Sequence, residues 1–290
     1  MEALMEWAVT GSYIILGMIV LLIAKLLQDF LTPYRLDEQL TEQDNPALGL
    51  SVTGYLTGAV IIFLGAAGGE FSADFDIAEL GIGTFATMLA RDGGYALGGI
   101  VCLNLARWLL DKVMLPRFST AKEIIEDRNI GMGAVEFGAY IASSLTIAAA
   151  IHGEGGGPLT ALACFGLGQL ALILFARLYQ VNTPFDLHKE LERDNVAAGV
   201  VLGGGLIALG IILWSACHGD FLGWALFLER FAYQAVFGFV LLALMRMFTD
   251  RILLPKADLA REIAEDRNLG AAFLEAGLAI AIAGLVVVML

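Results

Sequence analysis

The chain has 290 residues, of which 58% are hydrophobic and only 16% are charged, and its formal net charge is −13. A soluble globular domain is closer to half apolar and a quarter charged, so this composition indicates a membrane protein. The acidic balance argues against nucleic acid as a partner, because binding nucleic acid requires a basic surface.

Eight apolar segments are each close to the roughly 20 residues that a helix needs to cross a bilayer. We expect the spans at 8–30, 46–68, 95–115, 131–151, 159–179, 196–216, 231–252 and 269–289. The partly apolar links 70–94 and 219–230 are longer than the others. The first of them predicts an outer helix lying in the membrane interface, with a re-entrant segment as the alternative. The fold class is therefore an all-α membrane protein with eight transmembrane helices.

The chain contains an internal repeat. Residues 123–138 recur at 262–277 with an offset of 139, and the segment Glu-Asp-Arg-Asn stands at the same place in both copies. Arg107 and Asp111 match Arg246 and Asp250 at the same offset. These matches predict two four-helix repeats, 1–157 and 158–290. Four spans return the chain to its starting side, so the two repeats are parallel.

The distribution of basic residues predicts the orientation. Fifteen of the 17 Lys and Arg residues lie in or beside the turns that follow spans 1, 3, 5 and 7, and only Arg91 and Arg230 lie on the opposite side. Because basic residues are retained on the cytoplasmic side, we expect both termini to be periplasmic.

The charged segments between spans have two interpretations. Pro116 and Pro255 should end spans 3 and 7. Ser119 or Thr120 can then cap the next helix, with Thr120 and Glu123 as a capping box. This helix should run unbroken to about residue 150, with its first turns protruding. The first interpretation is a capped, salt-bridged structure, in which Asp-Asn turns act as helix N-caps. The second is a cytoplasmic mouth or docking surface, formed by Asp44, Asn45, Glu126, Asp127, Arg128, Asn129, Asp194, Asn195, Glu265, Asp266, Arg267 and Asn268.

Two glutamates inside spans are the sharpest feature of the sequence. Glu136 and Glu275 occupy the same repeat position, and an ionisable group at that depth is costly unless it is paired, protonated or hydrated. We expect them to face the bundle and, if the repeat axis brings them together, to form a proton or cation site. Tyr140 and Ser143 continue the polar face in the first repeat only, which favours Glu136 as the functional copy. The alternative is a structural carboxyl that joins helices.

The cysteines and histidines predict no metal, cofactor or catalytic centre. Cys102, Cys164 and Cys217 all lie in apolar segments, and no loop carries a pair, so we expect small buried residues rather than a bridge. His152 and His218 end spans on the outer side, but two fragments so far apart in sequence fall short of a metal-ligand pattern. We therefore expect a protein that is not an enzyme.

The segments Asp-Asn-Pro-Ala-Leu-Gly at 44–49 and Ile-Ile-Glu-Asp-Arg-Asn-Ile-Gly-Met-Gly-Ala-Val-Glu at 124–136 resemble the YjfL-like family of bacterial inner-membrane proteins, a domain of unknown function. The resemblance covers each half, so the chain is similar to a tandem of two such domains. It implies a multi-pass protein of the bacterial inner membrane and a link to membrane-stress proteins, without an established activity. The second copy departs from the motif at Val196 and Ala272, which replace proline and glycine.

Two functions follow as hypotheses. The first is a channel or transporter for a small cation or proton, with its path between the halves and Glu136 and Glu275 as the titrating groups. The second is a membrane scaffold whose charged cytoplasmic segments dock a membrane-stress protein. Besides the lipid bilayer, a further partner is a second copy of the chain: the two halves make either one closed unit or half of a homo-oligomer.

Overall fold

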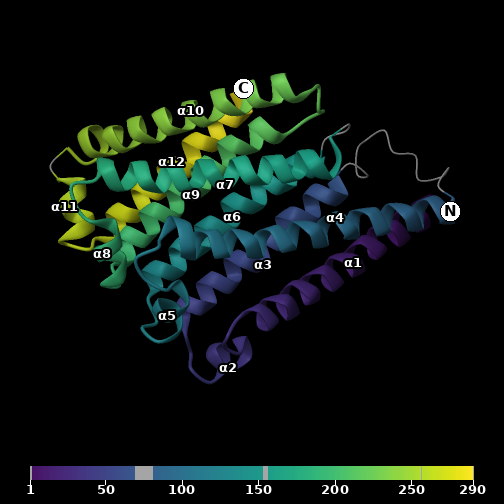
Figure 1. Ribbon diagram of the computed structural model, residues 1–290, viewed down its shortest axis with the longest axis horizontal. Helices are drawn as coiled ribbons and strands as arrows, with labels where there is room; N and C mark the ends of the chain where they lie inside the picture. The colour runs from purple at the N-terminus through teal and green to yellow at the C-terminus, as the bar shows by residue number, and fades with distance from the viewer. Residues whose placement is uncertain (1, 69–80, 153–155, 256, 290) are drawn as a thin grey trace.

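The computed structural model describes residues 2–68, 81–152, 156–255 and 257–289. These residues form a bundle of long helices with short helices at one end (Figure 1). Within these described ranges, eight helices are long and apolar enough to cross a membrane. They are α1 (Glu2–Leu31), α3 (Pro46–Ala67), α4 (Ile82–Leu109), α6 (Ile130–His152), α7 (Gly157–Asn182), α9 (Val196–Cys217), α10 (Trp224–Phe248) and α12 (Leu269–Met289). The predicted fold class is thus confirmed in its helical, eight-span form.

Each half contains the same sequence of elements. A π-helical turn follows α4 and α10, namely η3 (Leu110–Met114) and η4 (Thr249–Leu253). Short helices join the long ones on the side rich in Lys and Arg, hereafter the basic side. They are α2 (Leu36–Thr41), α5 (Thr120–Ile125), α8 (Leu187–Glu192) and α11 (Leu259–Ala264). The N-terminus lies at the opposite end of the bundle (Figure 1).

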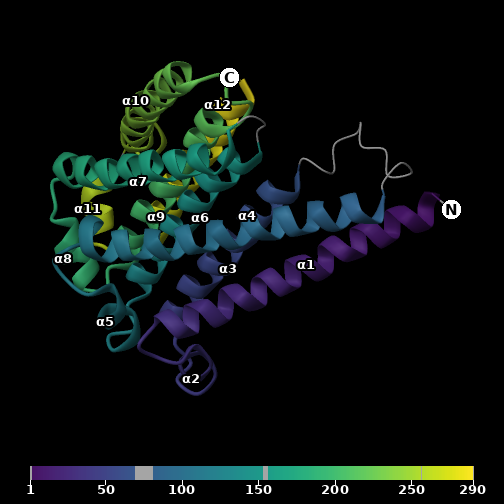
Figure 2. The same ribbon diagram turned by 45° about the vertical axis from the view of Figure 1, so that its right-hand side comes forward.

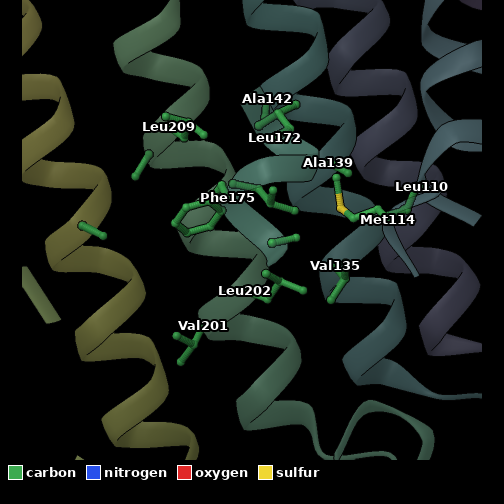
Figure 3. Packing of buried hydrophobic residues seen from close by; sticks show 14 of the residues in the cluster. Leu110, Met114, Val135, Ala139, Ala142, Leu172, Phe175, Val201, Leu202 and Leu209 are labelled. Atoms are coloured by element: carbon green, nitrogen blue, oxygen red, sulfur yellow. The ribbon is translucent and has the colours of Figure 1, made fainter. Parts of the chain in front are cut away.

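Two helices at the centre join the repeats. α6 packs against α3 of its own repeat and against α9 of the other, and α9 packs in turn against α12. The backbones of α6 and α9 approach so closely that a Cβ atom on Gly138 would overlap the backbone of Gly203. Small residues permit such approach between membrane helices. Around this contact the apolar core runs through both repeats, from Met114 and Val135 to Leu202 and Leu209 (Figure 3).

A repeated turn explains the Asp-Asn and Arg-Asn pairs. Asp44, Arg128, Asp194 and Arg267 have φ between 47° and 54°, a left-handed conformation that reverses the chain after a short helix. The asparagine that follows each of them then binds the first turn of a long helix. The side chains of Asn45 and Asn195 accept hydrogen bonds from the amides of Leu48 and Ala198, both at 3.1 Å. The predicted N-caps are confirmed.

Two expectations for the segment after Pro116 were wrong. The helix expected from residue 120 to about 150 is interrupted at the left-handed Arg128, so α5 and α6 are separate helices. Of the two expected caps, Ser119 is the one that caps α5. Thr120 and Glu123 form no capping box, because Thr120 bonds to Asp111 and the Glu123 carboxylate accepts from the Asn129 amide at 3.0 Å.

The long links also differ from expectation. Residues 82–94 belong to α4, which continues the span outward, and α10 likewise begins at Trp224 rather than at 231. These extensions are apolar enough to prolong a helix, and the sequence pattern could not separate them from an interfacial segment. Residues 69–80, on which the rest of the expected outer helix falls, lie outside the described residues.

Candidate functional site

Glu136 lies in a buried polar cluster of the first repeat. Its side chain is 1% exposed on α6, and one carboxylate oxygen accepts a hydrogen bond from the Ser51 hydroxyl of α3. The nearby positive charge is the Arg107 guanidinium of α4. That guanidinium also bonds to the Tyr34 hydroxyl at 3.2 Å, and burial raises the pKa of Tyr34 to about 12. The cluster thus contains one carboxylate, one guanidinium and several hydroxyls.

Two tyrosines complete this cluster toward the middle of the membrane. The rings of Tyr55 and Tyr140 meet edge to face, with centroids 5.4 Å apart. The Tyr55 hydroxyl accepts from the Asn104 amide at 2.8 Å and donates to the Ala24 carbonyl at 3.2 Å. In contrast, the Tyr140 hydroxyl and the Oε1 atom of Glu136 are buried and make no hydrogen bond to another described protein group. Buried polar atoms of this kind are where a water or a proton can bind.

Glu275 lies in the matching place of the second repeat but has different neighbours. The Arg246 guanidinium of α10 is 3.6 Å from its carboxylate. The same guanidinium donates to the Tyr179 hydroxyl at 2.6 Å and lies 5.0 Å from the centre of the Tyr179 ring. This arrangement is an ion pair held by a tyrosine from α7.

The second repeat lacks most of the hydroxyl groups of the first. The positions of Ser51, Tyr55, Asn104 and Tyr140 are taken by Val201, Gly205, Ala243 and Ala279. The space left by the missing side chains is a mostly apolar cavity of about 100 Å³ beside Arg246 and Glu275. Phe175, which stands where the first repeat has Ala24, occupies the space over Gly205. The two repeats therefore offer a polar cluster and an apolar cavity at equivalent positions.

The glutamates do not form a shared site. We expected a repeat axis to bring Glu136 and Glu275 together, but α9 packs between α6 and α12, and each carboxylate is balanced by an arginine of its own repeat. Ser143, expected beside Glu136, accepts a hydrogen bond from Gln169 of α7 at 2.8 Å. Ser143 therefore contributes to the contact between the repeats.

The basic-side residues divide into buried caps and exposed charges. Asn45, Asn129 and Asn195 are at most 2% exposed. The Asn129 amide also donates to the Leu191 carbonyl in the second repeat, at 2.5 Å. Burial raises the pKa of Glu123, although its bond from Asn129 acts in the opposite direction. The remaining residues of the expected mouth are exposed, namely Asp44, Glu126, Asp127, Arg128, Asp194, Glu265, Asp266, Arg267 and Asn268, and their role stays a prediction.

Sequence reasoning missed the arginines of both clusters. Arg107 and Arg246 match at the same offset of 139 as the two glutamates, which was the available signal. They were counted as loop charges because they stand near the ends of their spans. A single buried charge should prompt a search for its partner at the same membrane depth, and these two arginines are the repeated candidates.

The outer end of the bundle holds a feature that the sequence analysis excluded. Cys164 of α7 and Cys217 of α9 form a disulfide, with Cα atoms 6.2 Å apart, while Cys102 is free. The expectation of three unbridged cysteines was wrong because two spans, and not a loop, bring the pair together. Next to the bridge, the rings of His152 and His218 stack with centroids 5.1 Å apart, and burial lowers the pKa of His218.

These features define a class: a helical protein with eight membrane-spanning helices, built from two repeats that each combine a half-buried arginine with a buried glutamate. The chain belongs to the family described as Domain of Unknown Function (DUF350), whose model matches residues 2–151 and again residues 155–290. It is also 23% identical over 249 residues to the UPF0719 transmembrane protein of Aquifex aeolicus (strain VF5), covering 84% of this chain and 86% of that protein. No solved structure matches the chain.

Proposed function

We propose that the protein transfers protons across the membrane and that Glu136 is the group that exchanges them. The observation that carries the proposal is the pair of buried polar atoms, Glu136 Oε1 and the Tyr140 hydroxyl, which make no hydrogen bond to another described protein group. A carboxyl group at this depth is costly to keep. A site that takes up and releases a proton accounts for that cost.

The positive charge of Arg107 limits which species the site can bind. The Arg107 guanidinium already balances the Glu136 carboxylate. A metal cation would have to displace that guanidinium or bind beside it against its repulsion. A proton needs no such room, because it converts the carboxylate into a neutral acid. Of the two species that the sequence suggests, a small cation and a proton, the cluster favours the proton.

The second repeat supports a division of roles. One oxygen of Glu275, Oε2, also makes no hydrogen bond to another described protein group. Glu275 is, however, paired with Arg246 at 3.6 Å, and Gly205 and Ala279 stand where the first repeat has Tyr55 and Tyr140. We assign Glu275 a structural role and place the exchange in the first repeat. The path then runs through one repeat and not between the halves.

The test is proton flux into liposomes that contain the purified protein and a trapped pH-sensitive dye. We expect Glu136→Gln to abolish the flux and the matched variant Glu275→Gln to retain it. Equal flux in the wild type and in Glu136→Gln would refute the role of Glu136. If liposomes with the wild-type protein show neither proton nor K⁺ flux, the transport proposal as a whole is contradicted.

The orientation proposed for this function places both termini and the disulfide in the periplasm of a bacterial inner membrane. Two independent features support it. Basic residues gather on the side of α2, α5, α8 and α11, as expected of a cytoplasmic face. The Cys164–Cys217 bridge lies at the opposite end, and disulfides persist in oxidising compartments.

A second candidate function is a scaffold that docks a cytoplasmic protein, such as a membrane-stress protein. It is supported by the repeated exposed triplets Glu126-Asp127-Arg128 and Glu265-Asp266-Arg267 on the basic side. The left-handed turns at Arg128 and Arg267 hold these charges in defined positions. A protein that co-purifies with the wild type and is lost from Arg128→Ala or Arg267→Ala would support docking. Unchanged co-purification in both variants would contradict it.

A further inference from the structure

The four central helices form a row in which one kind of contact recurs. α3 packs on α6, α6 on α9, and α9 on α12. The contact between α6 and α9 joins the two repeats, so it is a contact between the end of one repeat and the beginning of the next. The row stops at α3 on one side and at α12 on the other, while α1 and α10 lie toward opposite edges of the bundle (Figure 2). Each terminal helix of the row has one face that the described part of neither repeat covers.

The open face of α12 corresponds to the face by which α6 binds α9. α12 has the repeat position of α6, and the contact residues Gly131, Gly138 and Ala142 match Gly270, Gly277 and Ala281. A Cβ atom on Gly138 would meet the backbone of α9, whereas one on Gly277 would meet nothing within 4 Å. In its most apolar 18-residue stretch, α12 has 28% of its residues buried and α6 has 78%. The buried share of α12 is lower because no described helix packs on the face by which α6 contacts α9.

The open face of α3 corresponds in the same way to the face by which α9 binds α6. At an offset of 150, the contact residues Gly199, Gly203 and Gly210 match Gly49, Thr53 and Val60. Gly49 is half-buried, and Thr53 and Val60 are exposed. All three are small or of moderate size, as is typical where membrane helices meet. Because Thr53 and Val60 carry side chains, a partner helix would lie farther from α3 than α6 lies from α9.

The outer helix of the repeat shows the same difference. α7 begins the second repeat and packs on α6 of the first. α1 has the equivalent position in the first repeat, where its contacts among the described residues are with α3 and α4 of the same repeat. The buried share of the most apolar stretch is 50% in α7 and 17% in α1. The side of α1 that corresponds to the α6-binding side of α7 is thus available to a neighbour.

A hydrogen bond between the repeats at the basic side also has no equivalent at the end of the second repeat. The buried Asn129 amide crosses from the first repeat to the Leu191 carbonyl of the second. The matching Asn268 is exposed, and its amide bonds to Glu262 of its own repeat at 2.8 Å. The residue that matches Leu191 is the half-buried Leu40 in α2. A second copy placed as the second repeat is placed on the first would bring the Leu40 carbonyl to the amide of Asn268.

We propose that the protein assembles head to tail, so that α12 of one copy packs against α3 and α1 of the next. The internal contact between the repeats is the template for the contact between copies. Such an interface uses two different surfaces, and it produces a ring when the rotation closes and a linear chain when it does not. The proposal is independent of proton transfer, because the Glu136 cluster lies within one repeat.

Cysteine cross-linking tests the arrangement. Inside the chain, Ala142 faces Gly210, and the matching pair between copies is Ala281 and Val60. In a Cys102→Ser background, we expect Val60→Cys with Ala281→Cys in one chain to give a ladder of disulfide-linked oligomers after mild oxidation of membranes. Each variant alone should give monomers, because a head-to-tail contact does not place the same residue of two copies side by side. The control pair is Ala281→Cys with Val101→Cys, since Val101 is 61% exposed on α4 away from this face.

The outcomes separate the alternatives. A ladder confined to the Val60 and Ala281 pair supports the proposal. Dimers in a single variant would show a face-to-face arrangement and overturn it. Monomers in every sample would show that lipid covers these faces, and would overturn it as well.

A substitution that spares the monomer provides an independent measurement. Gly277→Leu meets open space in the single chain, so the monomer should unfold at the wild-type temperature, but the added side chain should separate two copies. We expect Gly277→Leu to convert the oligomer into monomers in mass measurements of membrane-extracted protein. Gly166→Leu, which also meets open space but lies on the exposed face of α7, should leave the assembly unchanged. Equal mass in the wild type and in Gly277→Leu would contradict the proposed interface.

Discussion

Arg246 on α10 and Glu275 on α12 form an ion pair with 3.6 Å between the guanidinium and the carboxylate. Both residues belong to the second repeat, and their matches Arg107 and Glu136 interact electrostatically in the first. Each repeat therefore balances its own buried charge. This relationship explains how glutamates persist inside two membrane spans without meeting each other.

The ion pair predicts a non-additive effect on stability. Arg246→Met alone leaves the Glu275 carboxylate unpaired, and breaking a buried pair costs about 3–5 kcal/mol. Arg246→Met combined with Glu275→Leu removes both charges, and we expect it to recover most of that loss. Equilibrium unfolding in mixed micelles measures the free energies. Simple addition of the two single-variant effects would contradict a direct pair.

The matching asparagines predict different losses. Asn129→Ala removes an N-terminal helix bond and leaves the Leu191 carbonyl without the amide that crosses between repeats, so we expect a loss of about 2–3 kcal/mol. Asn268→Ala removes a cap from an exposed position, and we expect about 1 kcal/mol. The free energy of unfolding of the two variants is the measurement. Equal losses would show that the bond between the repeats contributes nothing.

The bridge predicts the accessibility of the cysteines to thiol reagents. We expect unfolded, unreduced protein from membranes to take up one maleimide group, on Cys102, because Cys164 and Cys217 are bridged. Reduction before labelling should raise the number to three. Intact-mass measurement counts the labels, and Cys217→Ser is the control that exposes Cys164 without reduction. Three labels on unreduced wild type would contradict the bridge.

Much of the fold follows from the sequence because its signals are local or repeated. The spans are long apolar runs, and Asn45 and Asn195 precede them as caps, so both could be placed from the order of residues alone. The repeat predicted that each half would have the same elements. The break at Arg128 was missed because an arginine in a left-handed turn has no pattern that distinguishes it from a helical arginine.

The candidate site was less predictable because it depends on which spans are neighbours. Glu136 and Glu275 were found from their depth in the membrane, but the choice of Arg107 and Arg246 as partners needs the packing of α4 on α6 and of α10 on α12. The exchange of Tyr55 and Ala24 for Gly205 and Phe175 is visible in the sequence only when the repeats are aligned residue by residue. In the first repeat the large residue is on α3 and the small one on α1, whereas in the second repeat the large residue is on α7 and the small one on α9. Either arrangement fills the same space between the two helices.

The histidine of α8 predicts a pH-dependent stability. Burial lowers the pKa of His188, and the charge of Arg117 acts in the same direction. The folded protein therefore favours the neutral ring, so this contribution to stability is complete above the ordinary histidine pKa of about 6.5 and is lost as the pH falls through the lowered value.

His188→Gln retains an amide that can contact Gln180, the neighbour of the Nδ1 atom at 3.3 Å, and removes the titration. We expect the melting temperature of the wild type to fall more than that of His188→Gln between pH 7.5 and pH 5. His218→Gln is the matched control at the outer end, since it leaves the α8 contribution in place. Parallel melting curves for the wild type and His188→Gln would show that folding does not change the pKa of His188.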